Sequence, residues 1–226
     1  MGALVKHWPR ILVTLLPLVF ALLHAVGAVH LDVLDRLDNI IYDTRLRATM
    51  PRSLDDRVVI VDLDEKSLAA VGRWPWGRNR MAELTDELFD RQKVALLGFD
   101  VVFAEADESS GLKRLNELAQ KELKDQPGFV DKLRQLQPLL DYDAMFAKAL
   151  EGRAVVLGYY LTSDDREGLT SGVLPAPVMT KSDLQGRPIS FTSWNGYGGN
   201  IAQLAKAAPI EGHFNPIPER DGVVRS

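Results

Sequence analysis

The sequence predicts an α/β domain, a three-layer sandwich with a mostly parallel central sheet, preceded by one transmembrane helix that continues into a stalk helix. Three observations predict this organisation. Residues 11–29 form a long uncharged apolar run, residues 30–50 follow with an amphipathic helical pattern, and short apolar runs then alternate with helical segments over residues 51–226. Short β-branched runs separated by helices are typical of parallel strands joined by crossovers.

The composition restricts the function classes. The chain has 226 residues, of which 46% are hydrophobic, so it is long enough for one sizeable core. Its net charge of −4 gives no electrostatic reason to expect a nucleic-acid partner. The sequence contains no cysteine, which excludes disulfides, zinc–thiolate sites and thiol catalysis.

The N-terminal apolar run predicts a membrane anchor. Residues 11–29 contain no charged side chain, and at ~1.5 Å per residue such a helix spans close to the ~30 Å hydrocarbon core. Lys6 and Arg10 precede the run and aspartates follow it, so residues 1–10 are expected to be cytoplasmic and the rest to lie outside. Val26, Gly27 and Ala28 would also suit signal-peptide cleavage, but the run exceeds the usual ~7–15 apolar residues of such peptides. A retained anchor is therefore favoured, and His24 within it is assigned no function.

A stalk helix is expected over residues 30–50, continuing from the anchor without a break. Leu31, Leu34, Leu37 and Ile41 recur at spacings of three and four residues and form one apolar stripe. This stripe would either pair with a second copy of the chain or dock on its own domain. Docking is favoured, because three turns are too few to predict a coiled coil.

The first part of the domain predicts two parallel strands whose carboxyl ends meet. Residues 58–61, which are Val-Val-Ile-Val, and residues 94–99 read as buried strands, separated by helices over residues 66–71 and 79–91. A right-handed crossover would place both carboxyl ends at one edge of the sheet. That edge would gather Asp62, Asp64 and Asp100, with Asp107 in the loop beyond.

The remaining elements complete the domain. Residues 110–140 suggest a helical insertion, broken at residues 127–128. The other patterns predict helices over 143–150 and 201–207, strands over 154–161 and 191–194, and a strand–turn–strand unit with its turn at residues 221–222. Because the chain stops inside this last unit, we expect a longer parent protein.

The acidic edge has two interpretations. Asp62, Asp64 and Asp100 offer the carboxylate oxygens that Ca²⁺ or Mg²⁺ prefers, and together with Asp107 they would also suit a cationic ligand. In the structural alternative, which is favoured, Asp62 caps a helix with Glu65 three residues on, and Asp100 pairs with Arg73 or Arg78. No EF-hand, phosphate-loop or HExxH spacing occurs, so a membrane-anchored metal-dependent hydrolase is only an alternative.

The segment from Arg73 to Arg78 is the most distinctive turn in the chain. Trp74 and Trp76 flank Pro75, and the two arginines stand at its ends. The rings would form a wall for a small ligand, with an arginine reaching an anion. Alternatively they close the core over the sheet edge, which is favoured for at least one ring.

Four motifs in this order carry a resemblance to a known family: VVIVDLDEKSL, GRWPWGR, LLGFDVVFAEAD and GHFNPIPERDGVVR. Together they resemble the type 2 CHASE domain, an extracytoplasmic sensor module, over residues 38–226. The resemblance implies a bacterial receptor in the inner membrane with a periplasmic sensor domain, further membrane helices and a cytoplasmic effector, which would be an adenylate or guanylate cyclase or, alternatively, a histidine or Ser/Thr kinase. It also implies that this chain is not itself an enzyme, that it pairs as a homodimer through the stalk and sensor domain, and that its stimulus is a small ligand or a protein.

Overall fold

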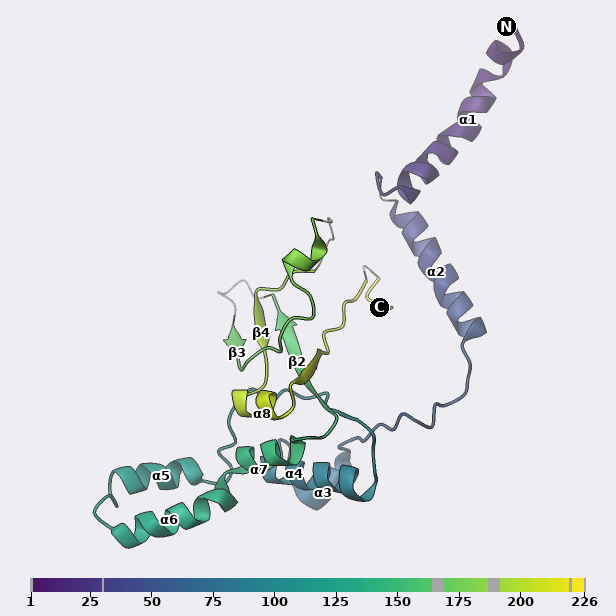
Figure 1. Cartoon of the computed structure of the whole chain (residues 1–226). Helices are drawn as coiled ribbons and strands as arrows, with labels where there is room; N and C mark the ends of the chain where they lie inside the picture. Colours follow the sequence, from purple (N-terminus) through teal and green to yellow (C-terminus); the bar gives the residue numbers. More distant parts are fainter. Residues whose placement is uncertain (1, 30, 164–168, 187–191, 220, 226) are drawn as a thin grey trace. The chain divides into compact units, whose positions relative to one another are not determined.

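The computed structural model describes residues 2–29, 31–163, 169–186, 192–219 and 221–225. The chain divides into two compact units (Figure 1). The first comprises Met1–Val61 and Pro218–Ser226, and the second comprises Asp62–Ile217.

The first unit contains two helices, α1 (Gly2–Ala25) and α2 (Asp32–Thr49). Within α1, His7–Ala25 is long and apolar enough to cross a membrane, and no second such helix occurs among the described residues. The expectation of an uninterrupted helix from anchor to stalk is wrong. Gly27 adopts a left-handed conformation with φ of +74° after α1 ends, because glycine has no Cβ to oppose it.

The imidazole of His24 lies at the joint between these two helices. Its Nε2 is 3.4 Å from a carboxylate oxygen of Asp35, and its Nδ1 accepts a hydrogen bond of 3.3 Å from the backbone N–H of Leu31. The side chain thereby links the end of α1 to the start of α2.

The described residues near the C-terminus, 218–219 and 221–225, belong to the same unit and include the turn that the sequence predicts at residues 221–222. Gly222 N–H donates to the carbonyl of Glu219 at 2.9 Å, and Glu219 N–H donates to the carbonyl of Val223 at 3.0 Å. Gly222 has φ of +80°, which favours glycine. No strand follows the turn among the described residues, so the second strand of the expected strand–turn–strand unit is not formed.

The second unit is built around β2 (Val155–Thr162), which confirms the strand expected over residues 154–161. It pairs in parallel with β1 (Leu97–Gly98) and β5 (Ile210–His213), and antiparallel with β4 (Gly196–Gly198), which pairs in parallel with β3 (Thr170–Ser171). The sheet therefore has mixed orientation, and the three-layer arrangement is not confirmed.

Two expected strands are wrong. Residues 58–61 have no strand partner in the described structure, and their side chains are 54–88% exposed. An apolar β-branched run favours extended backbone but does not supply the neighbouring strand that it needs. Residues 192–194 are not a strand either, and Phe191 lies outside the described residues.

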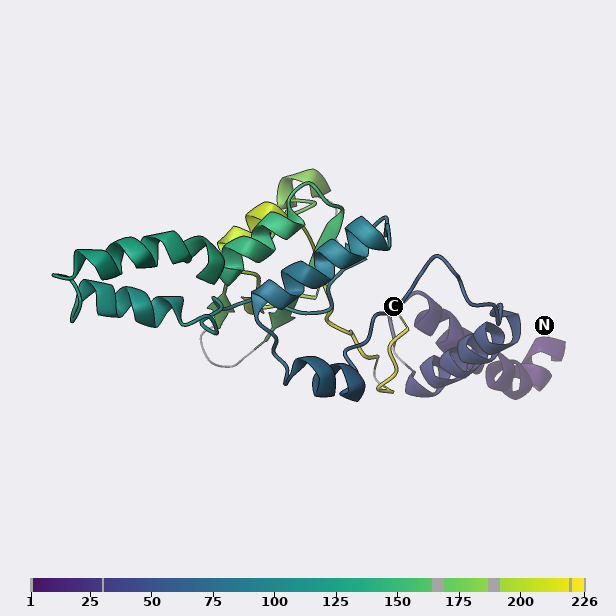
Figure 2. The ribbon, with the colours of Figure 1, turned by 90° about the horizontal axis from the view of Figure 1, so that it is seen from below.

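The helices follow the sequence pattern more closely. The short helix expected at 66–71 is α3 (Glu65–Val71), and that at 79–91 is α4 (Arg78–Asp86) with a π-helical turn over Glu87–Arg91. The predicted helical insertion is a hairpin of α5 (Leu112–Gln120) and α6 (Pro127–Leu140), which projects from the rest of the second unit in both views (Figures 1 and 2). The remaining helices are α7 (Tyr142–Leu150), a 3-10 turn (Lys181–Leu184) and α8 (Ala202–Ala207).

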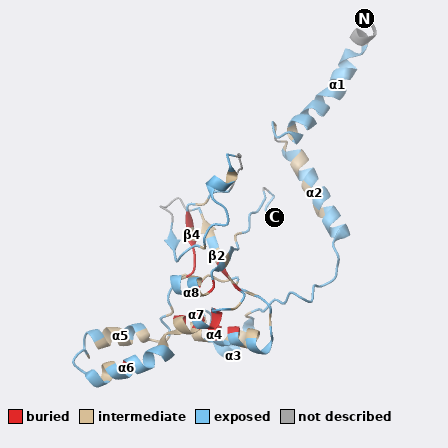
Figure 3. Ribbon diagram, in the orientation of Figure 1, coloured by how far each residue is buried: buried red, intermediate tan, exposed pale blue. Residues whose placement is uncertain are grey.

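The core lies where α4, α7 and α8 meet the sheet (Figure 3). Phe99, Phe103 and Phe146 pack edge to face, with ring centroids 5.1–5.8 Å apart, and the last two are fully buried. Asn200 is also fully buried. Its amide accepts from Phe103 N–H at 2.9 Å and donates to the carbonyl of Gly158 at 3.0 Å, so it fixes the chain beyond β1 against β2.

Candidate functional site

The structure does not gather the acids of the expected sheet edge into one cluster among the described residues. No group of three or more described Asp, Glu or His side chains is placed to hold a metal ion, so Asp62, Asp64 and Asp100 are not brought together as a ligand set. Asp64, rather than Asp62, is the N-cap of α3, where its carboxylate accepts from Ser67 N–H at 2.9 Å. The expected clustering of these three aspartates depended on a strand over residues 58–61, and that strand is not formed.

A groove of about 590 Å³ lies instead at the carboxyl ends of the parallel strands. Asp100 follows β1, Tyr160 lies in β2, and Phe214 follows β5. The lining is completed by residues from around α3 and after β1: Leu63, Leu68, Trp74, Val101 and Val102. The structure thus brings two predicted site residues, Trp74 and Asp100, together. Sequence analysis missed Tyr160 and Phe214, although their positions at strand ends were a usable signal.

The two tryptophans of the turn have different environments. The indole N–H of Trp76 donates to the carbonyl of Gly72 at 2.8 Å, and its ring packs against the core. The Trp74 ring meets that of Trp76 edge to face, with centroids 6.1 Å apart. Trp74 is 39% exposed and lines the groove. The Trp74–Pro75 peptide is cis. Arg73 is exposed and is not part of the groove lining.

Arg78 starts α4 and is at the centre of a largely buried ion-pair network. Its guanidinium lies 4.4 Å from the centre of the Phe103 ring, and its Nε is 3.7 Å from Oδ1 of Asp143. Its backbone N–H donates to Oδ2 of Asp107 at 2.5 Å, and Asp107 N–H donates to Oδ2 of Asp143 at 2.8 Å. The expected pairing of Arg78 with Asp100 is therefore wrong, and sequence analysis missed Asp143.

The two carboxylates of this network have pKa values shifted in opposite directions. Burial raises the pKa of Asp143, and the nearby Arg78 offsets only part of this effect. Burial would also raise the pKa of Asp107, but hydrogen bonds from Ser109 and from the Arg78 amide hold it below its ordinary value. Burial lowers the pKa of Arg78 itself. Because all these contacts join the start of α4 to the loop after β1 and to α7, the network stabilises the fold.

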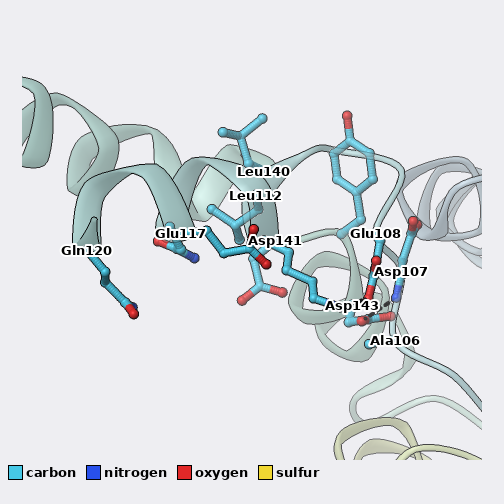
Figure 4. A pocket seen from close by; sticks show the side chains of 12 residues that line it. Ala106, Asp107, Glu108, Leu112, Glu117, Gln120, Leu140, Asp141 and Asp143 are labelled. Carbon is cyan, nitrogen blue, oxygen red and sulfur yellow. Dashed lines mark hydrogen bonds and ion pairs between the residues drawn. The ribbon is translucent and has the colours of Figure 1, made fainter. Parts of the chain in front are cut away.

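A second pocket of about 390 Å³ lies beside this network (Figure 4). It is bounded by the loop containing Asp107 and Glu108, by α5 and by the start of α7. Most of its acids already serve the fold: Glu108 contacts the Lys113 ammonium at 2.5 Å, and Asp141 caps α7 by accepting from Ala144 N–H at 2.9 Å. The acids of this pocket therefore do not by themselves indicate a ligand.

The first unit contains a separate cluster around Arg225. Its guanidinium donates to both oxygens of Asp43 on α2, at 2.8 and 3.0 Å. It also donates to Glu219 at 2.7 Å and to Asp221 at 2.8 and 3.0 Å, and its side chain is only 9% exposed. Asn39 on α2 adds a weaker contact of 3.4 Å to Asp221.

The hydrogen bonds from Arg225 lower the pKa of Asp221 to about 2 and also lower that of Asp43. The pKa of Arg225 is raised by the same contacts. Sequence analysis interpreted Asp221 only as a turn residue and missed this cluster. The available signal in the sequence was the spacing of four residues between Asp221 and Arg225. Asp43, in the segment expected to form the stalk helix, was a possible distant partner of Arg225.

These features define a class: a mixed α/β domain joined to an apolar helix of membrane-spanning length, with a groove at the carboxyl ends of its parallel strands. Residues 15–226 match the family model of the CHASE2 domain, which covers nearly the whole chain. The chain therefore belongs to the CHASE2 domain family, whose members are extracytoplasmic sensor domains. No curated protein and no solved structure matches the chain significantly.

Proposed function

We propose that this chain is the input module of a transmembrane receptor. Its N-terminus lies in the cytoplasm, α1 crosses the bacterial inner membrane, and the α/β domain senses a stimulus in the periplasm. The effector is a cytoplasmic adenylate or guanylate cyclase, with a histidine or Ser/Thr kinase as the alternative. Membership of a sensor family and one apolar helix of sufficient length support this proposal.

The Arg225 cluster is the observation that carries the proposal. A receptor domain needs a rigid link between its sensing part and the helix that enters the membrane. Within the first unit, Arg225 would contribute to such a link, because one nearly buried guanidinium binds a carboxylate of α2 and two carboxylates of the C-terminal turn, into which the chain of the second unit continues. A change in the position of this turn would therefore move α2, which directly follows the membrane helix.

Pairing of two copies through α2 is part of the proposal. The helix has no buried residue in the described structure, and Val33, Leu37, Ile40 and Ile41 are 48–70% exposed. Unpartnered apolar side chains on a helix favour a partner helix. Analytical ultracentrifugation in detergent should show a dimer that Leu37→Glu dissociates, and a wild-type monomer at all concentrations would contradict the pairing.

The experiment uses a full-length receptor containing this chain. Asp43→Asn removes the ionic link between α2 and Arg225, and leaves Arg225 bound to Glu219 and Asp221. We expect a several-fold change in basal effector output. The matched control is Asp55→Asn, which removes an exposed local ion pair with Arg57 in the same unit.

A distance measurement between α2 and the C-terminal turn accompanies the measurement of effector output. The sequence has no cysteine, so cysteines introduced at Ile41 and Val224 carry spin labels without background. Their distance distribution, measured after dilution with unlabelled chain, should broaden in Asp43→Asn and not in Asp55→Asn. If both output and distance distribution match wild type in Asp43→Asn, the cluster is not the link.

A further inference from the structure

We propose that the groove lined by Trp74, Asp100, Tyr160 and Phe214 binds a small organic cation with an apolar, preferably aromatic, body. The inference rests on the proposed sensor function and assigns the chemical class of its ligand. It is carried by the arrangement of one carboxylate and three large rings at the carboxyl edge of the sheet.

The apolar part of the groove is open to solvent. Trp74, Tyr160 and Phe214 are each about two-fifths exposed, and they gather in one depression with four aliphatic side chains. Covering such a surface is favourable by about 25 cal/mol for each Å² of apolar area. The volume of about 590 Å³ lies within the range of small-molecule sites.

The charge of the groove selects the sign of the ligand. Asp100 is the one charged side chain in the lining, and its carboxylate makes no hydrogen bond or ion pair with another described residue. No described lysine or arginine lines the groove, so an anion would find no cationic side chain among the described residues there. An ammonium group would meet the free carboxylate and, in addition, the negative faces of aromatic rings.

The sheet fixes the position of two rings. Phe214 N–H donates to the carbonyl of Tyr159 at 3.2 Å, which continues the pairing of β5 with β2. A Cβ at Gly158 would lie 2.9 Å from the Phe214 ring and 2.7 Å from the carbonyl oxygen of Phe99. Glycine therefore allows Phe214 to lie across β2, where its ring is 6.4 Å from that of Tyr160. The aromatic part of the groove is preformed.

The test measures binding of phenethylammonium to the whole chain in detergent micelles. Its neutral analogue, 2-phenylethanol, controls for apolar partitioning, and tetramethylammonium tests the charge without an aromatic body. Thermal stabilisation and tryptophan fluorescence report on the complex, since a ligand of the native state raises stability by RT ln(1 + [L]/Kd). We expect phenethylammonium to bind at least tenfold more tightly than 2-phenylethanol.

Asp100→Asn is the decisive variant, because this exposed side chain has no partner in the fold whose loss would unfold the domain. The substitution should weaken the binding of phenethylammonium at least tenfold and leave the binding of 2-phenylethanol unchanged. Asp131→Asn, an exposed acid on α6 outside the groove, should bind like wild type. Equal binding of the amine and the alcohol, no effect of Asp100→Asn, or no saturable binding at millimolar concentration would each overturn the proposal.

The outcome is distinguishable from that of the receptor proposal. If binding of phenethylammonium depends on Asp100 while effector output is unaffected by Asp43→Asn, the ligand proposal stands and the proposed link through Arg225 is rejected. If effector output responds to Asp43→Asn but phenethylammonium does not bind, the link through Arg225 stands and the ligand proposal is rejected.

Discussion

Replacing Asp143 by alanine tests whether the buried network around Arg78 holds the second unit together. The substitution leaves the Arg78 guanidinium, whose side chain is 12% exposed, without its nearest buried carboxylate. It also removes the acceptor of the part-buried Asp107 N–H. Breaking a buried ion pair by removing one partner typically costs ~3–5 kcal/mol, and the orphaned amide is part of that cost.

The lower end of this range is expected here. Burial raises the pKa of Asp143, which shows that its charged form is already penalised in the folded state. We therefore expect Asp143→Ala to reduce the free energy of unfolding by ~3 kcal/mol. For a unit of this size that corresponds to a Tm lower by roughly 6–12 °C.

The assay is urea unfolding of the chain in detergent micelles, followed by fluorescence of Trp74 and Trp76, which directly precede Arg78. Asp131→Ala is the matched control, since it removes an exposed pair with Arg134 that should contribute at most about 1 kcal/mol. In a double-mutant cycle, Arg78→Met with Asp143→Ala should cost less than the sum of the single changes by ~1–3 kcal/mol. A cost below 1 kcal/mol for Asp143→Ala, or an additive cycle, would refute the reasoning.

Three further predictions concern the same unit. Phe146→Ala removes a fully buried ring from the aromatic trio and should lower the free energy of unfolding by ~3–5 kcal/mol in urea titrations, unlike Phe146→Leu. Burial raises the pKa of Glu211, so its contribution to stability is present below its ordinary pKa and is lost as pH rises through the folded pKa. Glu211→Gln should therefore raise Tm at pH 7–8 and not near pH 4, and an equal effect at both pH values would contradict this. Asp64→Ala removes the N-cap of α3 and should speed hydrogen exchange of the Ser67 amide, whereas Asp62→Ala should not.

Helices were predictable from the sequence because their signals are local. The apolar spacing predicted α7 to within one residue, and it predicted α4 together with the π-helical turn that follows it. Pro127 marked the start of α6. The glycine that separates α1 from α2 was visible too. It was overlooked because the apolar pattern continues across Gly27, although pattern alone does not determine backbone conformation.

Strand pairing and the sites were less predictable because they depend on distant partners. Residues 58–61 have the composition of a strand and yet have no neighbour in the described structure. The prediction that Asp100 pairs with Arg73 or Arg78 was wrong, and the acid nearest the Arg78 guanidinium, Asp143, lies 65 residues away on a helix that follows an insertion. Trp74 and Asp100 line one groove in the structure, whereas the sequence pattern grouped Asp100 with Asp62 and Asp64.

The two arginine networks differ in a way that suits them to different roles. Arg78 stacks on a core ring and joins elements of one unit, so its loss should destabilise that unit. Arg225 binds three carboxylates at once, so its loss leaves Asp43, Glu219 and Asp221 repelling one another and should release α2 from the C-terminal turn. Because the pKa of Asp221 is lowered, its ionised form stabilises the cluster at any pH above the ordinary pKa of aspartate. This contribution is lost as pH falls through the folded-state pKa of about 2. In the receptor that we propose, a stimulus is therefore expected to act on this cluster near neutral pH by binding or by force rather than by protonation of Asp221.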